Sequence, residues 1–198
     1  MRTANLILNG LIDSAWIAKK IKKDIFCTDG AYNKVKGMNI EAVIGDMDSI
    51  ESKEGVHLIE TPDQNYTDFE KAILFLKERY EKINIYGASG KESDHFLGNL
   101  SAAKKYKDDV EMMFKDPFQY YFFAKKNSII EDAKGRTISI IPFPLMIKVN
   151  SDGLQYPINN EDLIIGEYIS VRNKGIKDTV SISYEEGCGL IYVCERIK

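Results

Sequence analysis

The spacing of short apolar runs along the first 120 residues is the feature that most constrains what this chain can fold into. These runs alternate with longer stretches in which apolar residues recur at helical spacing, as at Phe69, Ala72, Ile73 and Leu76. Short apolar strands that alternate with helices are typical of βαβ units, whose strands form a largely parallel sheet covered on both faces. The first half of the chain is therefore predicted to be an α/β fold.

The sequence pattern changes after about residue 125, beyond which no long run of apolar residues at helical spacing appears. Short candidate strands are separated there by Gly, Pro, Asn and Asp, a pattern that predicts a β-sandwich. We predict a Rossmann-like α/β domain over residues 1–124 and a smaller all-β sandwich domain over residues 125–198. The expected strands are Leu6–Leu8, Ile25–Cys27, Ala42–Ile44, His57–Ile59, Ile83–Tyr86 and Val110–Phe114, then Thr137–Ile141, Met146–Val149, Tyr168–Arg172, Val180–Tyr184 and Leu190–Val193. The aromatic run at 117–123 is interpreted as a core strand or a segment at the domain interface rather than a stacking platform for a ligand, because large aromatic side chains dominate burial.

Composition excludes several classes of protein. The 198 residues include 27 Lys and Arg against 30 Asp and Glu, a net charge of −3, which argues against a nucleic-acid partner held by bulk positive charge. No apolar run reaches the roughly 18 residues that cross a bilayer, and no signal-peptide core follows Met1, so we expect a cytoplasmic protein without a membrane partner. With only two histidines and no paired cysteines, carboxylates must hold any metal.

Polar and glycine-containing segments follow four of the expected strands, at Asn9-Gly10, 28–31, 45–49 and 87–90. Ligands of open parallel sheets bind at the carboxyl ends of the strands, so these segments predict a shared crevice. Asp46 and Asp48 are two residues apart and would point the same way in extended backbone, as a Mg²⁺ site beside nucleotide phosphates requires. For an isolated Asp-x-Asp a plain turn is the favoured explanation, because the pattern is short, and glycosyltransferases that bind nucleotide sugars use the same pattern.

Two further clusters precede expected helices. Thr67 and Glu70 have the spacing of a capping box, and Asp68 in the first turn complements the helix dipole. Asp68 could also add a third carboxylate to the metal, and the two roles are compatible. The segment 87–95 resembles a phosphate loop but lacks the Gly and the Ser or Thr that a Walker A motif requires. Its small residues still allow the backbone to approach a polyphosphate, whereas Asp94 has a plain helix-capping role as the alternative.

Taken in order, these motifs resemble the thiamine pyrophosphokinase family. The resemblance covers nearly the whole chain. It is carried by the segments 45–49, 61–69 and 87–95, and then by 139–143, 153–157, Leu163, Gly166, Ser170, Asn173 and 187–190.

The resemblance implies an enzyme that transfers the pyrophosphoryl group of ATP to the hydroxyethyl oxygen of thiamine, giving thiamine diphosphate and AMP. It implies Mg²⁺ as cofactor and ATP as co-substrate. It also implies a homodimer in which thiamine lies between the α/β domain and the β-sandwich of the partner subunit. Such a transfer needs positioning and charge neutralisation rather than a covalent nucleophile, which agrees with the residue types present.

The matching motifs also imply roles for individual residues. The expected metal ligands are Asp46, Asp48 and Asp68, which with Asp94 form the expected catalytic group. The residues expected along ATP are Asp29, Gly30, Ser49, Gln64, Thr67, Gly87, Gly90 and His95. Those expected to face thiamine are Ser170 and Asn173. Asp46 and Asp94 are alternative acceptors of the thiamine hydroxyl proton, and the sequence does not choose between them.

This chain departs from the family pattern at two positions. Asn65 stands where an Asp is common, which removes a negative charge from the site, and Glu92 stands where many members have Arg, which reverses a charge near the expected polyphosphate. Lys91 is the neighbouring cation that could replace that Arg. Arg172 is interpreted as a surface charge. These departures keep two alternatives open: a binding protein that has lost catalysis, or another Mg-nucleotide transferase that uses Asp46 and Asp48.

Overall fold

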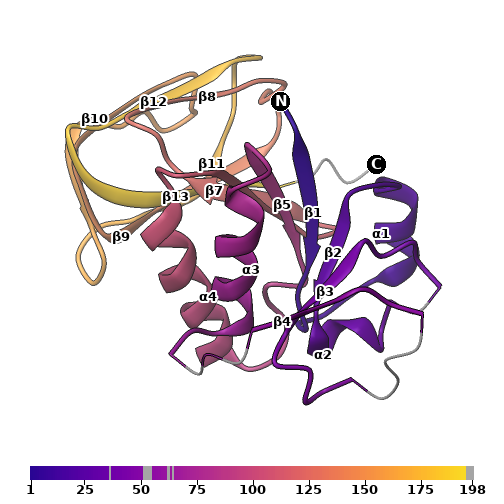
Figure 1. Cartoon of the computed structure of the whole chain (residues 1–198). Helices are drawn as coiled ribbons and strands as arrows, with labels where there is room; N and C mark the ends of the chain where they lie inside the picture. The colour runs from indigo at the N-terminus through magenta and orange to yellow at the C-terminus, as the bar shows by residue number, and fades with distance from the viewer. Residues whose placement is uncertain (36, 51–54, 62, 64, 195–198) are drawn as a thin grey trace. The chain divides into compact units, whose positions relative to one another are not determined.

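The computed structural model describes residues 1–35, 37–50, 55–61, 63 and 65–194 (Figure 1). The chain divides into two compact units, Met1–Pro117 and Phe118–Lys198. The units part before the aromatic strand β7 (Gln119–Phe123) rather than at the expected break near 124–127. The reason is that β7 pairs along its length with β13 (Glu186–Cys194) of the second unit.

Within the described residues, the sheet of the first unit contains six strands that all run parallel. Their order is β4-β3-β2-β1-β5-β6, so the direction of strand addition reverses between β1 and β5. The strands span Thr3–Ile7 (β1), Ile25–Thr28 (β2), Ala42–Gly45 (β3), Leu58–Glu60 (β4), Lys82–Tyr86 (β5) and Glu111–Lys115 (β6). Each overlaps one of the predicted apolar runs, and the residues of β2 and β3 are all buried.

The described part of this unit includes the helices α1 (Ser14–Lys20), α2 (Asp29–Tyr32), α3 (Asp68–Lys77) and α4 (Ser93–Tyr106). Helix α3 begins at Thr67, whose hydroxyl accepts a hydrogen bond from the N–H of Glu70 at 3.2 Å. Only this half of the predicted capping box forms. The buried Glu70 carboxylate accepts hydrogen bonds from Lys105 at 3.0 Å and Tyr106 at 2.9 Å instead, and so joins α3 to α4.

The second unit is an antiparallel assembly built around one long strand, β9 (Thr137–Asp152). Strands β10, β11, β12 and β13 all pair with β9, and β8 pairs with β12. The remaining bounds are Asn127–Ile130 (β8), Asn159–Ile164 (β10), Ser170–Lys174 (β11) and Val180–Ser183 (β12). The prediction of separate strands at 137–141 and 146–149 was wrong, because β13 pairs with β9 on both sides of the prolines that interrupt the pattern.

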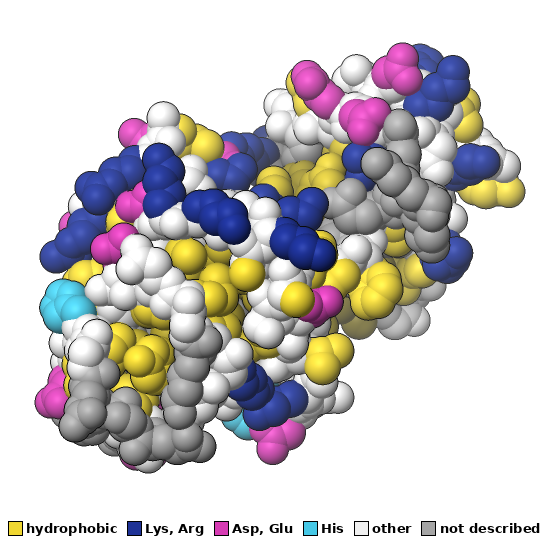
Figure 2. All heavy atoms as spheres, turned by 90° about the vertical axis from the view of Figure 1, so that its right-hand side faces the viewer, with side chains coloured by type: hydrophobic (Ala, Val, Ile, Leu, Met, Phe, Trp, Pro, Cys, Tyr) yellow, Lys and Arg dark blue, Asp and Glu magenta, His cyan; other side chains and the backbone are white. Residues whose placement is uncertain are grey.

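The interpretation of the aromatic run as a core strand is confirmed. Tyr121 and Phe123 on β7 are 3% and 8% exposed, and the Tyr121 ring stacks on Tyr192 with 4.7 Å between centroids. Among the residues described, no helix is long and apolar enough to cross a membrane. Figure 2 shows one face on which basic, acidic and hydrophobic side chains are interspersed, as the nearly balanced charge leads one to expect.

Candidate functional site

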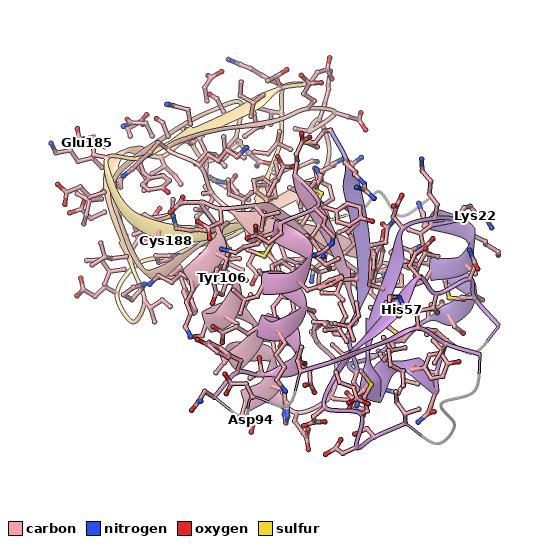
Figure 3. The ribbon with its side chains drawn as sticks, in the orientation of Figure 1. Lys22, His57, Asp94, Tyr106, Glu185 and Cys188 are labelled. Atoms are coloured by element: carbon pink, nitrogen blue, oxygen red, sulfur yellow. The ribbon has the colours of Figure 1, made fainter. Side chains whose placement is uncertain are left out.

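The loops that follow β1 and β5 lie side by side at the point where the strand order reverses. Leu8 N–H donates to the carbonyl of Tyr86, and Gly10 N–H donates to the carbonyl of Gly87, both at 2.8 Å. A pocket of about 510 Å³ opens here, within the size range of small-molecule sites. Figure 3 shows Asp94 at the N-terminal end of α4, the same end of the unit at which β1 and β2 terminate in Figure 1. The pocket therefore lies where open α/β sheets bind ligands.

Gly10 is required by the close approach of these two loops. A Cβ at this position would lie 2.3 Å from the carbonyl oxygen of Gly87 and 2.4 Å from that of Ser89. We expect Gly10→Ala to lower the free energy of unfolding by about 1–3 kcal/mol, because backbone rather than a mobile side chain must shift. Urea unfolding without ligand measures this. The matched control is Gly98→Ala inside α4, where a Cβ meets no atom within 4 Å and helix propensity predicts stabilisation by about 0.5–1 kcal/mol. Equal stability of the two variants would contradict the steric argument.

Three carboxylates converge at the edge of the pocket: Asp29, Asp46 and Asp48 each place an oxygen within 4.8 Å of the others. Asp29 is 2% exposed, and its Oδ1 accepts a hydrogen bond from the N–H of Gly30 at 2.6 Å. Its buried Oδ2 has no hydrogen-bond partner among the described residues. Burial raises the pKa of Asp29 to about 6, and the charges of Asp68 and Asp46 add to that increase. An unpartnered carboxylate oxygen in a negative cluster fits a hard cation such as Mg²⁺.

A tight turn, rather than extended backbone, brings Asp46 and Asp48 to the same side. Met47 between them has a left-handed φ of 66°, and its side chain is 4% exposed in the core cluster of the first unit. The prediction that the two carboxylates align through strand-like alternation was therefore wrong in its geometry, although the pair does converge. Burial of the thioether offsets the cost of a left-handed non-glycine residue, which is about 1–2 kcal/mol.

Asp68 does not belong to this three-carboxylate group. Its Oδ1 lies 3.1 Å from the ammonium of Lys71, whose side chain is 4% exposed and lines the pocket. Asp68 and Lys71 occupy positions i and i+3 of α3, a spacing at which opposite charges contact on a helix surface, so this ion pair could have been predicted from the sequence. Lys71 is a site residue that the sequence analysis did not identify, together with Tyr66 and Asn99 of the pocket lining.

Glu92, Asp94 and His95 form an exposed group at the start of α4. The Nδ1 of His95 lies 3.0 Å from Glu92 Oε2 and 3.3 Å from Asp94 Oδ1, and its backbone N–H donates to Asp94 Oδ1 at 2.8 Å. This backbone hydrogen bond holds the pKa of Asp94 below its usual value. Helix α4 lacks a side-chain cap, since its N-cap residue Glu92 makes no capping hydrogen bond. The capping alternative for Asp94 is thus not what the structure contains.

Most of the predicted nucleotide-site residues line this pocket. They are Asp29, Gly30, Asp46, Ser49, Thr67, Asp68, Gly87, Asp94 and His95. Asp48 is adjacent through the three-carboxylate group, Gly90 lies against Leu11, and Gln64 falls outside the described residues. Asn65 donates to Asp63 from its backbone at 2.9 Å and its side chain at 2.8 Å, and the described pocket lining does not include it.

The two predicted thiamine residues lie on β11 of the second unit. Ser170 is 8% exposed and Asn173 is 4% exposed. The amide of Asn173 accepts a hydrogen bond from the N–H of Tyr156 at 3.1 Å and donates to the carbonyl of Tyr156 at 2.7 Å, so it fixes the segment before β10. Arg172 between them is exposed, as expected of a surface charge.

The pocket lies where open α/β proteins bind ligands, at the reversal of a parallel sheet, and the carboxylates beside it are of the type that hard cations prefer. Two family profiles match successive parts of the chain: thiamin pyrophosphokinase, catalytic domain, over residues 17–114, and thiamin pyrophosphokinase, vitamin B1 binding domain, over residues 126–189. The chain belongs to the thiamine pyrophosphokinase family.

Individual relatives agree with this assignment. The chain is 28% identical over 157 residues to a thiamine pyrophosphokinase of Bacillus subtilis, covering 72% of this chain and 73% of that one. It is 27% identical to thiamine pyrophosphokinase 1 of rice, with 72% and 62% covered. The crystal structure of the thiamine pyrophosphokinase of B. subtilis superposes with a TM-score of 0.83 at 22% identity, covering 99% and 100% of the two chains. That of Candida albicans gives a TM-score of 0.80 at 18% identity, covering 98% and 90%.

Proposed function

We propose that this protein is a thiamine pyrophosphokinase that transfers the pyrophosphoryl group of ATP to the hydroxyl oxygen of thiamine, giving thiamine diphosphate and AMP. The observation that carries the proposal is the group formed by Asp29, Asp46 and Asp48 in a pocket at the reversal of a parallel sheet. Few reactions need several carboxylates beside small-residue loops, and metal-assisted transfer of phosphoryl groups is one of them.

Each carboxylate has a distinct part in the proposed site. Asp46 and Asp48 would hold Mg²⁺ together with Asp29, the buried member whose free oxygen faces no other partner among the described residues. When bound, Mg²⁺ neutralises charge on the polyphosphate. Asp68 was expected as a third ligand; its ion pair with Lys71 gives it the additional role of holding a buried ammonium at the pocket wall. The residues Ser49, Thr67, Gly87 and Gly90 would let backbone N–H groups approach phosphate, with Gly30 and His95 in the same pocket. Gln64, which lies outside the described residues, is kept as an expected ATP contact.

In the transfer, the thiamine hydroxyl oxygen forms a bond to the β-phosphorus of ATP. The bond from that phosphorus to the oxygen bridging to the α-phosphate breaks, and AMP leaves with the bond's electron pair. The hydroxyl proton must pass to a base. We assign this role to Asp46 or Asp94, both of which line the pocket. The backbone hydrogen bond from His95 lowers the pKa of Asp94 and makes its carboxylate a weaker base for this step.

The second unit supplies the other substrate in this proposal. We assign ATP binding and catalysis to the Rossmann-like first unit, and thiamine binding through Ser170 and Asn173 to a β-sandwich in the second unit. Thiamine would lie at the interface of a homodimer, between the first domain of one subunit and the sandwich of its partner. Exposed apolar side chains of the second unit support a covered surface there: Ile165, Tyr168, Ile169, Val171 and Ile176 are 41–53% exposed. We place the protein in the cytoplasm.

The experiment that tests the proposal measures AMP formed by the purified protein with Mg-ATP, with and without thiamine. Thiamine-dependent AMP together with an equal amount of thiamine diphosphate is the expected result. If no AMP forms while thiamine or ATP still raises the melting temperature, the protein binds its ligands without catalysis, and Glu92 on the pocket wall becomes the residue to revert to Arg. Stabilisation by a UDP-sugar and not by ATP would instead select a nucleotide-sugar transferase.

A further inference from the structure

Two lysine side chains from separate segments converge on the turn after β1. The ammonium of Lys34, which follows α2, donates to the carbonyl oxygens of Asn9 at 2.9 Å and Gly10 at 3.2 Å. The ammonium of Lys91, which precedes α4, approaches the side-chain oxygen of Asn9 at 3.4 Å. Asn9, Gly10 and Lys91 all line the pocket described above. Two positive charges therefore meet at the pocket rim.

This arrangement is electrostatically unfavourable without a ligand. Burial, and then the neighbouring Lys91 ammonium, lowers the pKa of Lys34, as expected when two like charges are held together. Within the part of the chain that the structure describes, neither ammonium lies within 4.0 Å of a carboxylate. Their acceptors are neutral carbonyl and amide oxygens, which orient the two groups without neutralising them. An anion with more than one charge is the ligand that would relieve the repulsion.

The rest of the pocket indicates which part of an anion these lysines face. The carboxylates of Asp29 and Asp46 have the opposite charge to the lysines, and they repel phosphate unless a metal ion lies between them and the phosphate. A metal at the carboxylates and two lysines at the Asn9–Gly10 turn together supply positive charge at two places in one cavity. A polyphosphate chain is the ligand with negative charge at both, and its terminal phosphate carries the largest charge.

We propose that Lys34 and Lys91 form a two-lysine clamp for the terminal phosphate of the bound polyphosphate. This inference rests on the proposed function, in which the terminal phosphate of ATP is transferred with the β-phosphate and becomes the terminal phosphate of thiamine diphosphate. The clamp therefore binds ATP and the product thiamine diphosphate, but makes no contact with AMP. Lys91 of the clamp supplies positive charge on the loop in which Glu92 replaces the Arg of many family members.

The test compares the double variant Lys34→Ala, Lys91→Ala with wild type by calorimetric binding of ATP, thiamine diphosphate and AMP. We expect affinity for ATP and for thiamine diphosphate to fall at least about tenfold, and affinity for AMP to stay within about twofold. In turnover, KM for ATP should rise with little change in kcat, and the dependence of ATP affinity on salt should become weaker. Lys34→Arg, Lys91→Arg is expected to restore most of the ATP affinity.

The matched control is Lys19→Ala, Lys22→Ala on and just after α1, which removes two exposed charges; Figure 3 shows Lys22 far from Asp94. Lys22 also donates to a backbone carbonyl, that of Ala18 at 2.6 Å. Unchanged ATP affinity in the clamp variant would overturn the proposal. So would an equal loss of AMP affinity, since the lysines would then only hold the loop. The binding experiment does not depend on turnover, so it tests the two-lysine clamp separately from the proposed function. Wild-type protein that binds ATP but makes no thiamine-dependent AMP would refute the proposed function, whereas the binding affinities of the lysine variants would still test the clamp.

Discussion

The double variant Asp46→Asn, Asp48→Asn is expected to lose thiamine-dependent AMP formation by at least about 10²-fold while remaining folded. The two substitutions preserve side-chain shape but remove two of the three charges that converge within 4.8 Å. A site that has lost two charges binds Mg²⁺ weakly, and without the cation the charge of the polyphosphate is not neutralised. The measurement is AMP release at saturating thiamine over a range of Mg²⁺ concentrations, beside the melting temperature of the metal-free protein.

The control for this variant is Asp108→Asn, Asp109→Asn, which removes two exposed carboxylates just beyond the C-terminal end of α4. Its expected activity is that of wild type. The metal-site assignment fails if the pocket variant retains activity within a few-fold of wild type. A lowered melting temperature in the pocket variant alone would also count against it, because the loss of like-charge repulsion should not destabilise the metal-free fold.

The sequence predicted the first unit well because its signals are local. Helix α3 carries a capping Thr67 and an apolar face at Phe69, Ile73 and Leu76, all of which the structure contains. Strands β2 and β3 are short runs whose residues are all buried, and such runs are visible without knowledge of their neighbours. The clustering of the loops after these strands then follows from the general geometry of α/β sheets.

The errors arose where distant residues decide the local structure. Strand β10 (Asn159–Ile164) has a polar sequence with Leu163 as its one buried residue, and it is fixed by pairing with β9. Met47 adopts a left-handed conformation because the core receives its side chain, which no local signal announces. The convergence of Asp29 with Asp46 and Asp48 depends on where β2 and β3 end, because each carboxylate follows the C-terminal end of one of these strands. The approach of Lys34 to Lys91 likewise depends on two loops far apart in the sequence.

The variant Asp29→Asn is expected to stabilise the metal-free protein at pH 7 by on the order of 2 kcal/mol while it lowers activity. Burial raises the pKa of Asp29 from 3.8 to about 6, so the folded state binds its proton more tightly than the unfolded state does. Between about pH 4 and pH 6 the folded protein therefore holds more protons, and the free energy of unfolding falls as the pH rises through this window. Above it, the buried charge persists as a cost that Asn does not carry.

Chemical unfolding of wild type and variant at a series of pH values from 4 to 8, without divalent cations, measures this difference. The stability gain of Asp29→Asn should be small near pH 4, grow up to about pH 6 and then level off. Asp108→Asn at an exposed side chain is the control, with an expected change within about 0.5 kcal/mol. Mg²⁺ should stabilise wild type at pH 7 and stabilise the Asp29→Asn protein less, because the cation compensates the same buried charge that the substitution removes. A variant less stable than wild type at pH 7 without Mg²⁺ would show that the Asp29 carboxylate serves the fold through its hydrogen bond to Gly30, rather than being held at a cost for the site.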